Sequence, residues 1–372
     1  MAKTLLVGYK AADLTPALLA GDVTCHTLDV YHRHAIEKVH HAKAICSPHL
    51  PDGPWDVVRF RTGPKLMSGE LALDLLQECA KLVGHDLKPP RFVLDYVGRE
   101  RDRNDLLDKV RRDAARERSF KAEWPASVPG GPKLLFTSYP GCFCHRRLDE
   151  GGLALAEVVS RDLRAAPTPK QPNAQTAKRP NIQTLNLLDM GCGCGLVGLL
   201  VATAISDTRD ERGERGERNL AAPSSPHSAI RPVDPSPTHS IIRPFDHSII
   251  SSLVLVDSHA RAVEAAKENA AKFGVSAEVI LSDNGTPARM DGTFDVFVGN
   301  PPYYSDYRIA EVFLETAVRA LKPGGVCYQV VKNAAGLEPV QRRYFPDVEV
   351  IRRRNYCVLK SVKPVASRAA NR

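Results

Sequence analysis

Short apolar runs alternate with helical patterns along most of this chain. Strands that are apolar throughout are buried on both faces, so their alternation with helices predicts an α/β fold with a parallel sheet covered on both sides. A strongly periodic helix is predicted over Ser68–Val83. The apolar runs of the amino-terminal part are Thr4–Gly8, Val23–Tyr31, Ala44–Cys46, Trp55–Phe60 and Arg91–Val97.

Residues 1–130 are expected to form a first domain. Its first strand leads into Gly8-Tyr9-Lys10, with one glycine where a nucleotide-binding fold needs several to let backbone approach a ligand. We therefore expect the layout of a catalytic domain without its chemistry, acting as a scaffold or RNA-docking unit. A charged helix is predicted over Asn104–Lys121, and its mixed charges are interpreted as a solvent-exposed face. The segment Pro125–Pro132 is expected to be the linker to a second domain over 131–362.

An acid followed by alternating glycines marks the second half. The strand Leu185–Leu188 leads into Asp189, Gly191, Gly193 and Gly195, ahead of an apolar helix. Glycines let the backbone approach a ligand, whereas a carboxylate beside them repels phosphate. The pattern therefore favours S-adenosylmethionine, which carries a sulfonium and an ammonium, over NAD.

Two further acids follow strands. Asp257 closes the run Leu253–Val256, but it lies 66 positions after Gly191 (257 − 191) where about 20 are usual. The intervening residues 207–248 are low-complexity with a near-repeat beginning at His227 and again at His239, and they predict a disordered insertion rather than a metal-binding tract. Asp283 follows the strand Glu278–Leu281, where an acid can accept the amine of an adenine ring.

The run Phe294–Val298 ends in Asn300, Pro301, Pro302 and Tyr303. Adjacent prolines cannot donate backbone hydrogen bonds or continue a strand, so the chain leaves the sheet there in a stiff turn. In an open α/β sheet, the carboxyl end of a strand is where ligands bind.

With acids after three successive strands, residues 185–332 resemble a class I S-adenosylmethionine-dependent methyltransferase. The Asn-Pro-Pro-(Tyr/Phe) motif is that of enzymes that methylate planar amino or amide nitrogens. More narrowly, the chain resembles the small-domain methyltransferases of ribosomal RNA, the RsmC and RlmG group, which make N2-methylguanine. This match rests on the motif-poor first domain, on Tyr139–Cys144 with Arg147–Asp149, and on Asn300–Pro302.

The resemblance implies two Rossmann-like methyltransferase domains in tandem, of which the second is catalytic. It implies S-adenosylmethionine as cofactor and a catalytic role for Asn300, Pro301, Pro302 and Tyr303. The Asn300 oxygen and the Pro301 carbonyl would accept the two N–H bonds of the target amine, and Tyr303 would stack on the base. The implied cofactor-binding residues are Asp149, Asp189, Gly191, Gly193, Gly195, Asp257 and Asp283.

Other targets stay open at this point. The family more often has Phe where this sequence has Tyr303, so adenine N6 and protein glutamine N5 are alternative acceptors. A third hypothesis is a non-catalytic RNA-binding protein, for which degraded cofactor residues would be expected.

The charge balance suits a polyanionic partner. The formal net charge is +8 and the sequence pI is near 9.0, and arginine clusters at 146–147, 342–343 and 352–354 are candidate phosphate contacts. No signal-peptide pattern and no apolar run of membrane-spanning length is present, so we expect a cytoplasmic monomer acting on ribosomal RNA or a ribosomal subunit. The residues from 363 to 372 are expected to be a flexible tail.

Nine cysteines do not form the pattern of a disulfide scaffold. Cys142, Cys144 and His145, together with Cys192 and Cys194, have the residue types of a metal site, but their spacing is tighter than that of structural zinc. We expect no metal and ordinary buried side chains.

Overall fold

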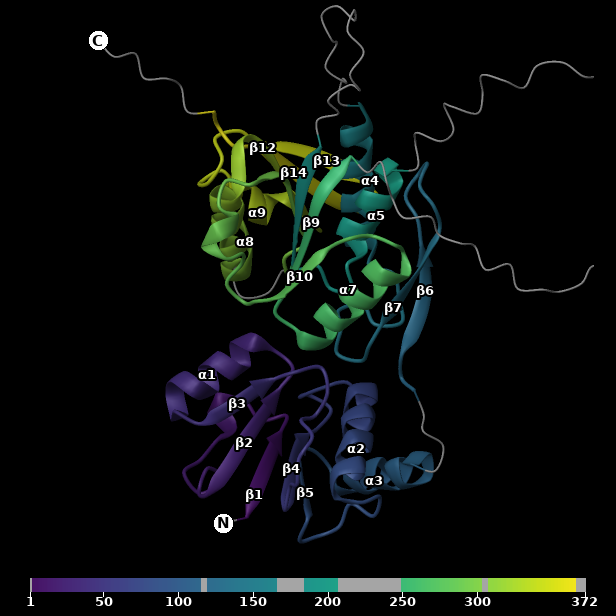
Figure 1. Cartoon of the computed structure of the whole chain (residues 1–372), viewed down its shortest axis with the longest axis vertical. Helices are drawn as coiled ribbons and strands as arrows, with labels where there is room; N and C mark the ends of the chain where they lie inside the picture. Colours follow the sequence, from purple (N-terminus) through teal and green to yellow (C-terminus); the bar gives the residue numbers. More distant parts are fainter. Residues whose placement is uncertain (1, 115–118, 166–183, 207–248, 303–306, 366–372) are drawn as a thin grey trace, which may run out of the picture.

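The computed structural model describes residues 2–114, 119–165, 184–206, 249–302 and 307–365. It contains two α/β domains, each built on its own sheet (Figure 1). The predicted insertion at 207–248 and the end of the predicted tail, 366–372, lie outside the described residues. Among the helices that are described, none has the length and apolarity needed to cross a membrane.

The first sheet is parallel throughout, in the order β3-β2-β1-β4-β5. Apolar residues of α2 and α3 pack with one face of this sheet, and α1 packs against the other face. The strands are β1 (Lys3–Val7), β2 (Asp22–Thr27), β3 (Lys43–Cys46), β4 (Val57–Thr62) and β5 (Phe92–Tyr96); the helices are α1 (Val30–His40), α2 (Gly69–Val83) and α3 (Glu100–Ala114), with the short 3₁₀ turn η1 (Ala11–Asp13).

The predicted end of the second strand was wrong. The strand expected over Val23–Tyr31 ends at Thr27, because the Asp29 carboxylate caps α1 by accepting a hydrogen bond of 2.8 Å from the Tyr31 amide. The predicted charged helix begins at Glu100, earlier than expected.

The second sheet has the order β10-β9-β8-β11-β12-β14-β13. Its first five strands are parallel, and β14 runs antiparallel to both β12 and β13. The strands are β8 (Leu185–Met190), β9 (Ile250–Asp257), β10 (Glu278–Leu281), β11 (Phe294–Gly299), β12 (Leu321–Val331), β13 (Glu349–Arg353) and β14 (Tyr356–Val362). The helices are α4 (Glu150–Ala165), α5 (Leu196–Ser206), α7 (Ala260–Lys272), α8 (Arg308–Ala320) and α9 (Ala334–Gln341), with the 3₁₀ turn η3 (Ala288–Met290).

Adjacent leucines of β8 show why its sequence is apolar without alternation. Leu187 lies in the cluster with α4, α5 and α7, and Leu188 lies in the opposite cluster with α8 and α9. Both are fully buried, because successive side chains of a strand point to opposite faces and helices cover both. The predicted doubly covered parallel sheet is confirmed.

The two sheets share the strand order of their first five strands. In each, the chain moves outward on one side, then restarts beside the first strand, which creates a switch point between β1 and β4 and another between β8 and β11. The carboxyl edges of the sheets face one another (Figure 1), since Asp29 after β2 forms an isolated bridge with His259 after β9. The predicted tandem architecture is confirmed.

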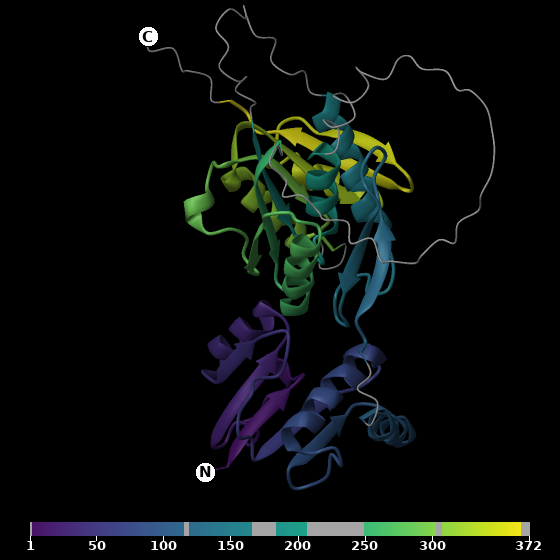
Figure 2. The same cartoon turned by 45° about the vertical axis from the view of Figure 1, so that its right-hand side comes forward.

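A hairpin replaces the predicted linker. Pro125–Pro132, expected as a linker, includes the end of β6 (Ala122–Ala126), which pairs antiparallel with β7 (Leu134–Ser138). Trp124 stacks on Phe136 with ring centroids 5.3 Å apart, and both belong to the core of the second domain. The hairpin lies along the second domain in Figure 2. The second domain therefore starts before residue 131. The prolines suggested a linker, but edge strands also tolerate proline.

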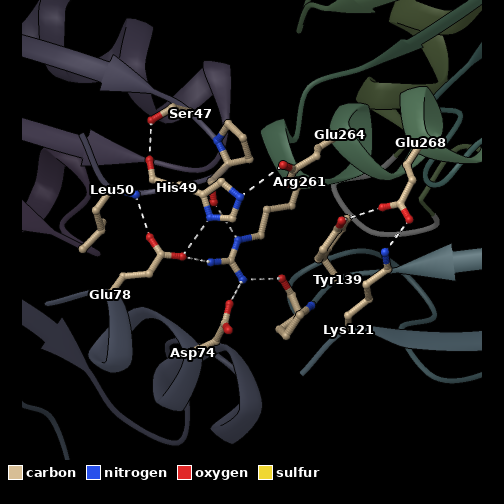
Figure 3. A network of polar contacts seen from close by, with 12 residues as sticks. Ser47, His49, Leu50, Asp74, Glu78, Lys121, Tyr139, Arg261, Glu264 and Glu268 are labelled. Atoms are coloured by element: carbon tan, nitrogen blue, oxygen red, sulfur yellow. Dashed lines mark hydrogen bonds and ion pairs between the residues drawn. The ribbon is translucent and has the colours of Figure 1, made fainter. Parts of the chain in front are cut away.

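Arg261 joins the two domains (Figure 3). Its side chain is 1% exposed, and its guanidinium donates to the Asp74 and Glu78 carboxylates of α2 and to the Pro48 carbonyl at 2.9 Å. Beside it, the two ring nitrogens of His49 each lie 3.1 Å from a carboxylate oxygen, of Glu78 in the first domain and of Glu264 in the second. A rigid donor fork of this kind holds several acceptors at once.

We expect Arg261→Ala to destabilise the protein by about 3–5 kcal/mol, because the variant leaves two half-buried carboxylates without their cation. Urea unfolding monitored by fluorescence would measure the loss. The control is Arg289→Ala, whose ion pair with Glu278 is 62% and 48% exposed and should cost less than about 1 kcal/mol. Equal losses in the two variants would contradict the structural role of Arg261.

Candidate active site

The predicted site residues gather at the carboxyl edge of the second sheet. Asp189 lies near the end of β8, Asp257 ends β9, and Asn300 follows β11. These three strands are direct neighbours, with Asp189 paired in register with Leu255 on one side and with Val298 on the other. The structure therefore places the three residues around the switch point between β8 and β11.

The glycine loop needs its glycines for two different reasons. Gly191, Gly193 and Gly195 have φ of +68°, +56° and +84°, a region that side chains rarely adopt. A Cβ atom on Gly191 would lie 2.7 Å from the Phe313 ring, so this glycine is needed for packing. A Cβ atom on Gly193 would meet nothing within 4 Å, so the backbone there borders open space.

Asp189 is 1% exposed and accepts a hydrogen bond of 2.8 Å from the Gly198 amide at the start of α5. Burial raises the pKa of this carboxyl to about 7, and the nearby charges of Asp257 and Asp149 add to the effect. A group with these surroundings is stabilised in its ionised form by a cationic ligand.

Asp257 braces the glycine loop. One carboxylate oxygen accepts from the Gly193 amide at 2.8 Å, and the other accepts from the His259 amide at 2.9 Å. Burial raises its pKa, and these amides act in the opposite direction. Because a carboxylate has about four acceptor positions, both oxygens retain a lone pair for ligand hydroxyls.

Asn300 is held by Asp149. The Asn300 amide nitrogen donates to Asp149 Oδ2 at 2.7 Å, while Asp149 Oδ1 accepts from the Gly151 amide at 3.0 Å at the start of α4. A carboxylate oxygen accepts, so this contact orients the amide with its nitrogen toward Asp149, and the Asn300 oxygen is left as an acceptor with no donor among the described residues. Pro301 and Pro302 follow directly, whereas Tyr303 lies outside the described residues.

Asp283 has an unexpected neighbour. It follows β10, as predicted, and its Oδ2 lies 3.0 Å from His34 Nδ1 of the first domain. No sequence pattern predicts this contact, because the two residues are 249 positions apart.

The first domain has no comparable loop at its switch point. Tyr9 follows β1 at the place where the second sheet has its glycines; it is 3% exposed, and the Arg61 guanidinium lies 6.0 Å from its ring centroid. A Cβ atom on Gly8 would lie 2.4 Å from the Arg61 carbonyl oxygen, so this glycine serves packing. At this switch point a buried aromatic side chain stands where the second sheet has its glycine loop.

Residues 246–360 match the family described as methyltransferase small domain. The match lies within the second domain. The resemblance to small-domain methyltransferases, inferred above from the motifs, is confirmed.

The chain also matches proteins named ribosomal RNA small subunit methyltransferase C. The protein of Pseudomonas syringae pv. syringae (strain B728a) is 24% identical over 236 residues, which are 62% of this chain and 51% of that protein. The protein of Pseudomonas aeruginosa (strain UCBPP-PA14) is 26% identical over 218 residues, covering 57% and 46%. The chain thus spans about half the length of these curated relatives.

One solved structure matches both domains. It is the T. thermophilus 16S rRNA N2 G1207 methyltransferase (RsmC) in complex with AdoMet and guanosine, with a TM-score of 0.65 and 16% identity. The match covers 98% of this chain and 88% of that one, so the two proteins share the tandem fold.

The arginine clusters are largely paired within the protein. Arg146 pairs with Glu70, Arg343 pairs with Glu311, and Arg353 and Arg354 both pair with Glu157. Their prediction as phosphate contacts is therefore weakened, because RNA would have to compete with these carboxylates.

Two residues at this edge of the second sheet were not predicted by the sequence analysis. Lys332 follows β12 at the same edge, and its ammonium lies 4.6 Å from the Tyr356 ring centroid. That ring is close to the start of α4, since a Cβ atom on Gly151 would lie 3.1 Å from it. The position of Lys332 after a predicted strand was a usable signal, whereas Tyr356 comes from the antiparallel strand β14 and gave none.

Three of the four cysteines in the two clusters lie in the core, and the fourth, Cys144, is half-buried. Cys142, Cys192 and Cys194 are buried within the cluster that contains α4 and α5, and burial raises the pKa of Cys142 to about 12. Within the described ranges the nine thiols are unpaired, and no His, Cys, Asp or Glu cluster there has the arrangement of a metal site.

The raised pKa of Asp189 predicts that the stability of the protein depends on pH. Its pKa is about 7 in the folded protein and about 3.9 in an unfolded chain, so its contribution to stability is full below pH ~4 and is lost as pH rises through 7. Since Asn does not ionise, we expect the free energy of unfolding of Asp189→Asn, relative to the wild type, to rise by about 3 kcal/mol from pH 5 to pH 8. Urea unfolding at both values tests this, with the exposed Asp52→Asn as control; a constant difference would contradict it.

Proposed function

We propose that this chain is an S-adenosylmethionine-dependent N-methyltransferase that acts on an exocyclic amine of ribosomal RNA, with guanine N2 as the target. It would work as a cytoplasmic monomer on ribosomal RNA or a ribosomal subunit. The observation that carries the proposal is the Asp149–Asn300 hydrogen bond beside three strand-end acids, because it leaves an oriented acceptor next to a site suited to a cationic ligand.

The residues present fit the cofactor. Gly193 borders open space, so the backbone there can be approached closely. The buried Asp189 carboxyl suits the ammonium of the methionine part, and Asp257 retains lone pairs for the ribose hydroxyls. Asp283 would accept the adenine amine. When bound, S-adenosylmethionine supplies an electrophilic methyl group on a sulfonium.

The protein's task is to orient a poor nucleophile. The lone pair of an exocyclic amine is delocalised into the base, so the amine reacts slowly unless its protons are held. In our proposal the Asn300 side-chain oxygen and the Pro301 carbonyl accept its two N–H bonds, which aims the nitrogen and stabilises the positive charge that develops on it. In the proposed reaction the nitrogen would bond to the methyl group as the methyl–sulfur bond breaks, which would leave a neutral thioether, and the nitrogen would then lose one proton to solvent.

Asp149 acts on this step through Asn300. Without its carboxylate the amide could rotate and present N–H groups, which would repel the target amine. Pro301 and Pro302 stiffen the turn that carries both acceptors, since their rings fix the backbone φ angle. A base within a duplex would have to be extruded first, at a cost of about a few kcal/mol.

The relatives support the choice of target. The T. thermophilus protein is an N2 methyltransferase of G1207 in 16S rRNA, and the Pseudomonas proteins are named as methyltransferases of the small ribosomal subunit. Transfer of that specificity to this chain, at 24% identity or thereabouts, is part of the proposal.

The function is tested by incubating the protein with labelled cofactor and, separately, small subunits, large subunits, naked rRNA and a release factor. We expect label in RNA, recovered as N2-methylguanosine by mass spectrometry of the digested nucleosides. Asn300→Ala should lower kcat at least ~100-fold and leave cofactor affinity unchanged, since it removes an acceptor of the target amine. Label on protein, or N6-methyladenosine, would overturn the target assignment; loss of cofactor binding in Asn300→Ala would overturn its role.

The glycine loop gives a separate test of the cofactor site. Gly193→Ala adds a methyl group that meets nothing in the fold, so we expect weaker S-adenosylmethionine binding in calorimetry with only the modest destabilisation of a strained φ. Gly292→Ala is a matched control, because Gly292 has φ +63° and a Cβ atom there also meets nothing within 4 Å. Equal affinities in both variants would show that the ligand does not approach Gly193.

A further inference from the structure

The first domain reaches the cofactor edge of the second through α1. The Val30 amide donates to the Ser258 carbonyl at 3.0 Å, and the Ala260 amide donates to the Leu28 carbonyl at 2.7 Å. The Ser258 hydroxyl also donates to Asp29 at 3.0 Å. The start of α1 is thus attached to the residues that directly follow Asp257.

One turn along α1, His34 extends to Asp283. Its Nδ1 lies 3.0 Å from Asp283 Oδ2, and its Nε2 lies 2.6 Å from the Arg33 guanidinium. A guanidinium can only donate, so Nε2 is the acceptor and the ring proton is on Nδ1. His34 therefore donates to Asp283, and its tautomer is set by Arg33.

This contact uses Oδ2 of Asp283, and Oδ1 has no hydrogen-bond donor within the described part of the chain. The Asp283 side chain is 17% exposed and that of His34 is 46% exposed, so the pair lies at the rim of the sheet edge. A carboxylate with one oxygen tied to an imidazole has a restricted rotation, and the free oxygen is held in one direction.

We propose that His34 is a positioning residue of the cofactor pocket, supplied by the domain that has no cofactor motif of its own. It orients the free oxygen of Asp283 toward the exocyclic amine of adenine. The inference rests on the proposed function, in which Asp283 accepts that amine. Adenine presents a donor at this position and hypoxanthine presents an acceptor, so His34 contributes to the preference for an adenine-containing cofactor.

The experiment uses the full chain and calorimetric binding of S-adenosylhomocysteine and its inosine analogue. His34→Asn places an amide N–H where Nδ1 stood, whereas His34→Gln places its amide near the position of Nε2. We expect His34→Ala and His34→Gln to bind S-adenosylhomocysteine about 5- to 10-fold more weakly and to lose preference over the inosine analogue, and His34→Asn to retain both. The exposed His85→Ala serves as control and should match the wild type.

The outcomes separate this inference from the proposed function. If the wild type binds neither ligand, the cofactor assignment fails. If Asp283→Asn leaves the preference unchanged, Asp283 does not meet adenine. If Asp283→Asn changes the preference but His34→Ala does not, or if His34→Asn behaves like His34→Ala, the positioning role of His34 is wrong. Equal melting temperatures of the His34 variants would exclude a folding defect as the cause of weaker binding.

Discussion

The common direction of the inner strands determines where every functional group of this protein can lie. β8 pairs in parallel with both β9 and β11, so the residues that follow these strands emerge at one edge. A shift of β8 by one residue would turn Asp189 to the other face of the sheet. The core on both faces of the sheet opposes such a shift, because Leu187 and Leu188 would exchange environments.

The sequence predicted the parts of the site that depend on local signals. Asp189 with its glycines, Asp257 and Asn300 were predicted because each follows an apolar strand, and parallel strands bring their carboxyl ends together. The tandem α/β architecture followed from the same alternation. The glycines were interpreted as one group, yet the structure separates Gly191, which makes room for Phe313, from Gly193, which borders open space.

The parts that were missed depend on contacts between distant segments. His34 reaches Asp283 across 249 positions, and Arg353 and Arg354 are paired with Glu157, almost 200 positions away. An arginine cluster looks the same in a sequence whether its partner is a phosphate or a buried carboxylate. The linker prediction at Pro125–Pro132 failed for a different reason, since prolines that end a domain also occur in edge hairpins.

The hairpin also limits how far the domains can separate. Phe120 packs in the first core and Trp124 packs in the second, so the chain passes from one domain to the other within four residues. A tether of that length spans at most about 14 Å when fully extended. Each domain therefore stays at a high effective concentration relative to the other, and a transient break of the Arg261 contacts would be followed by rapid re-docking instead of dissociation.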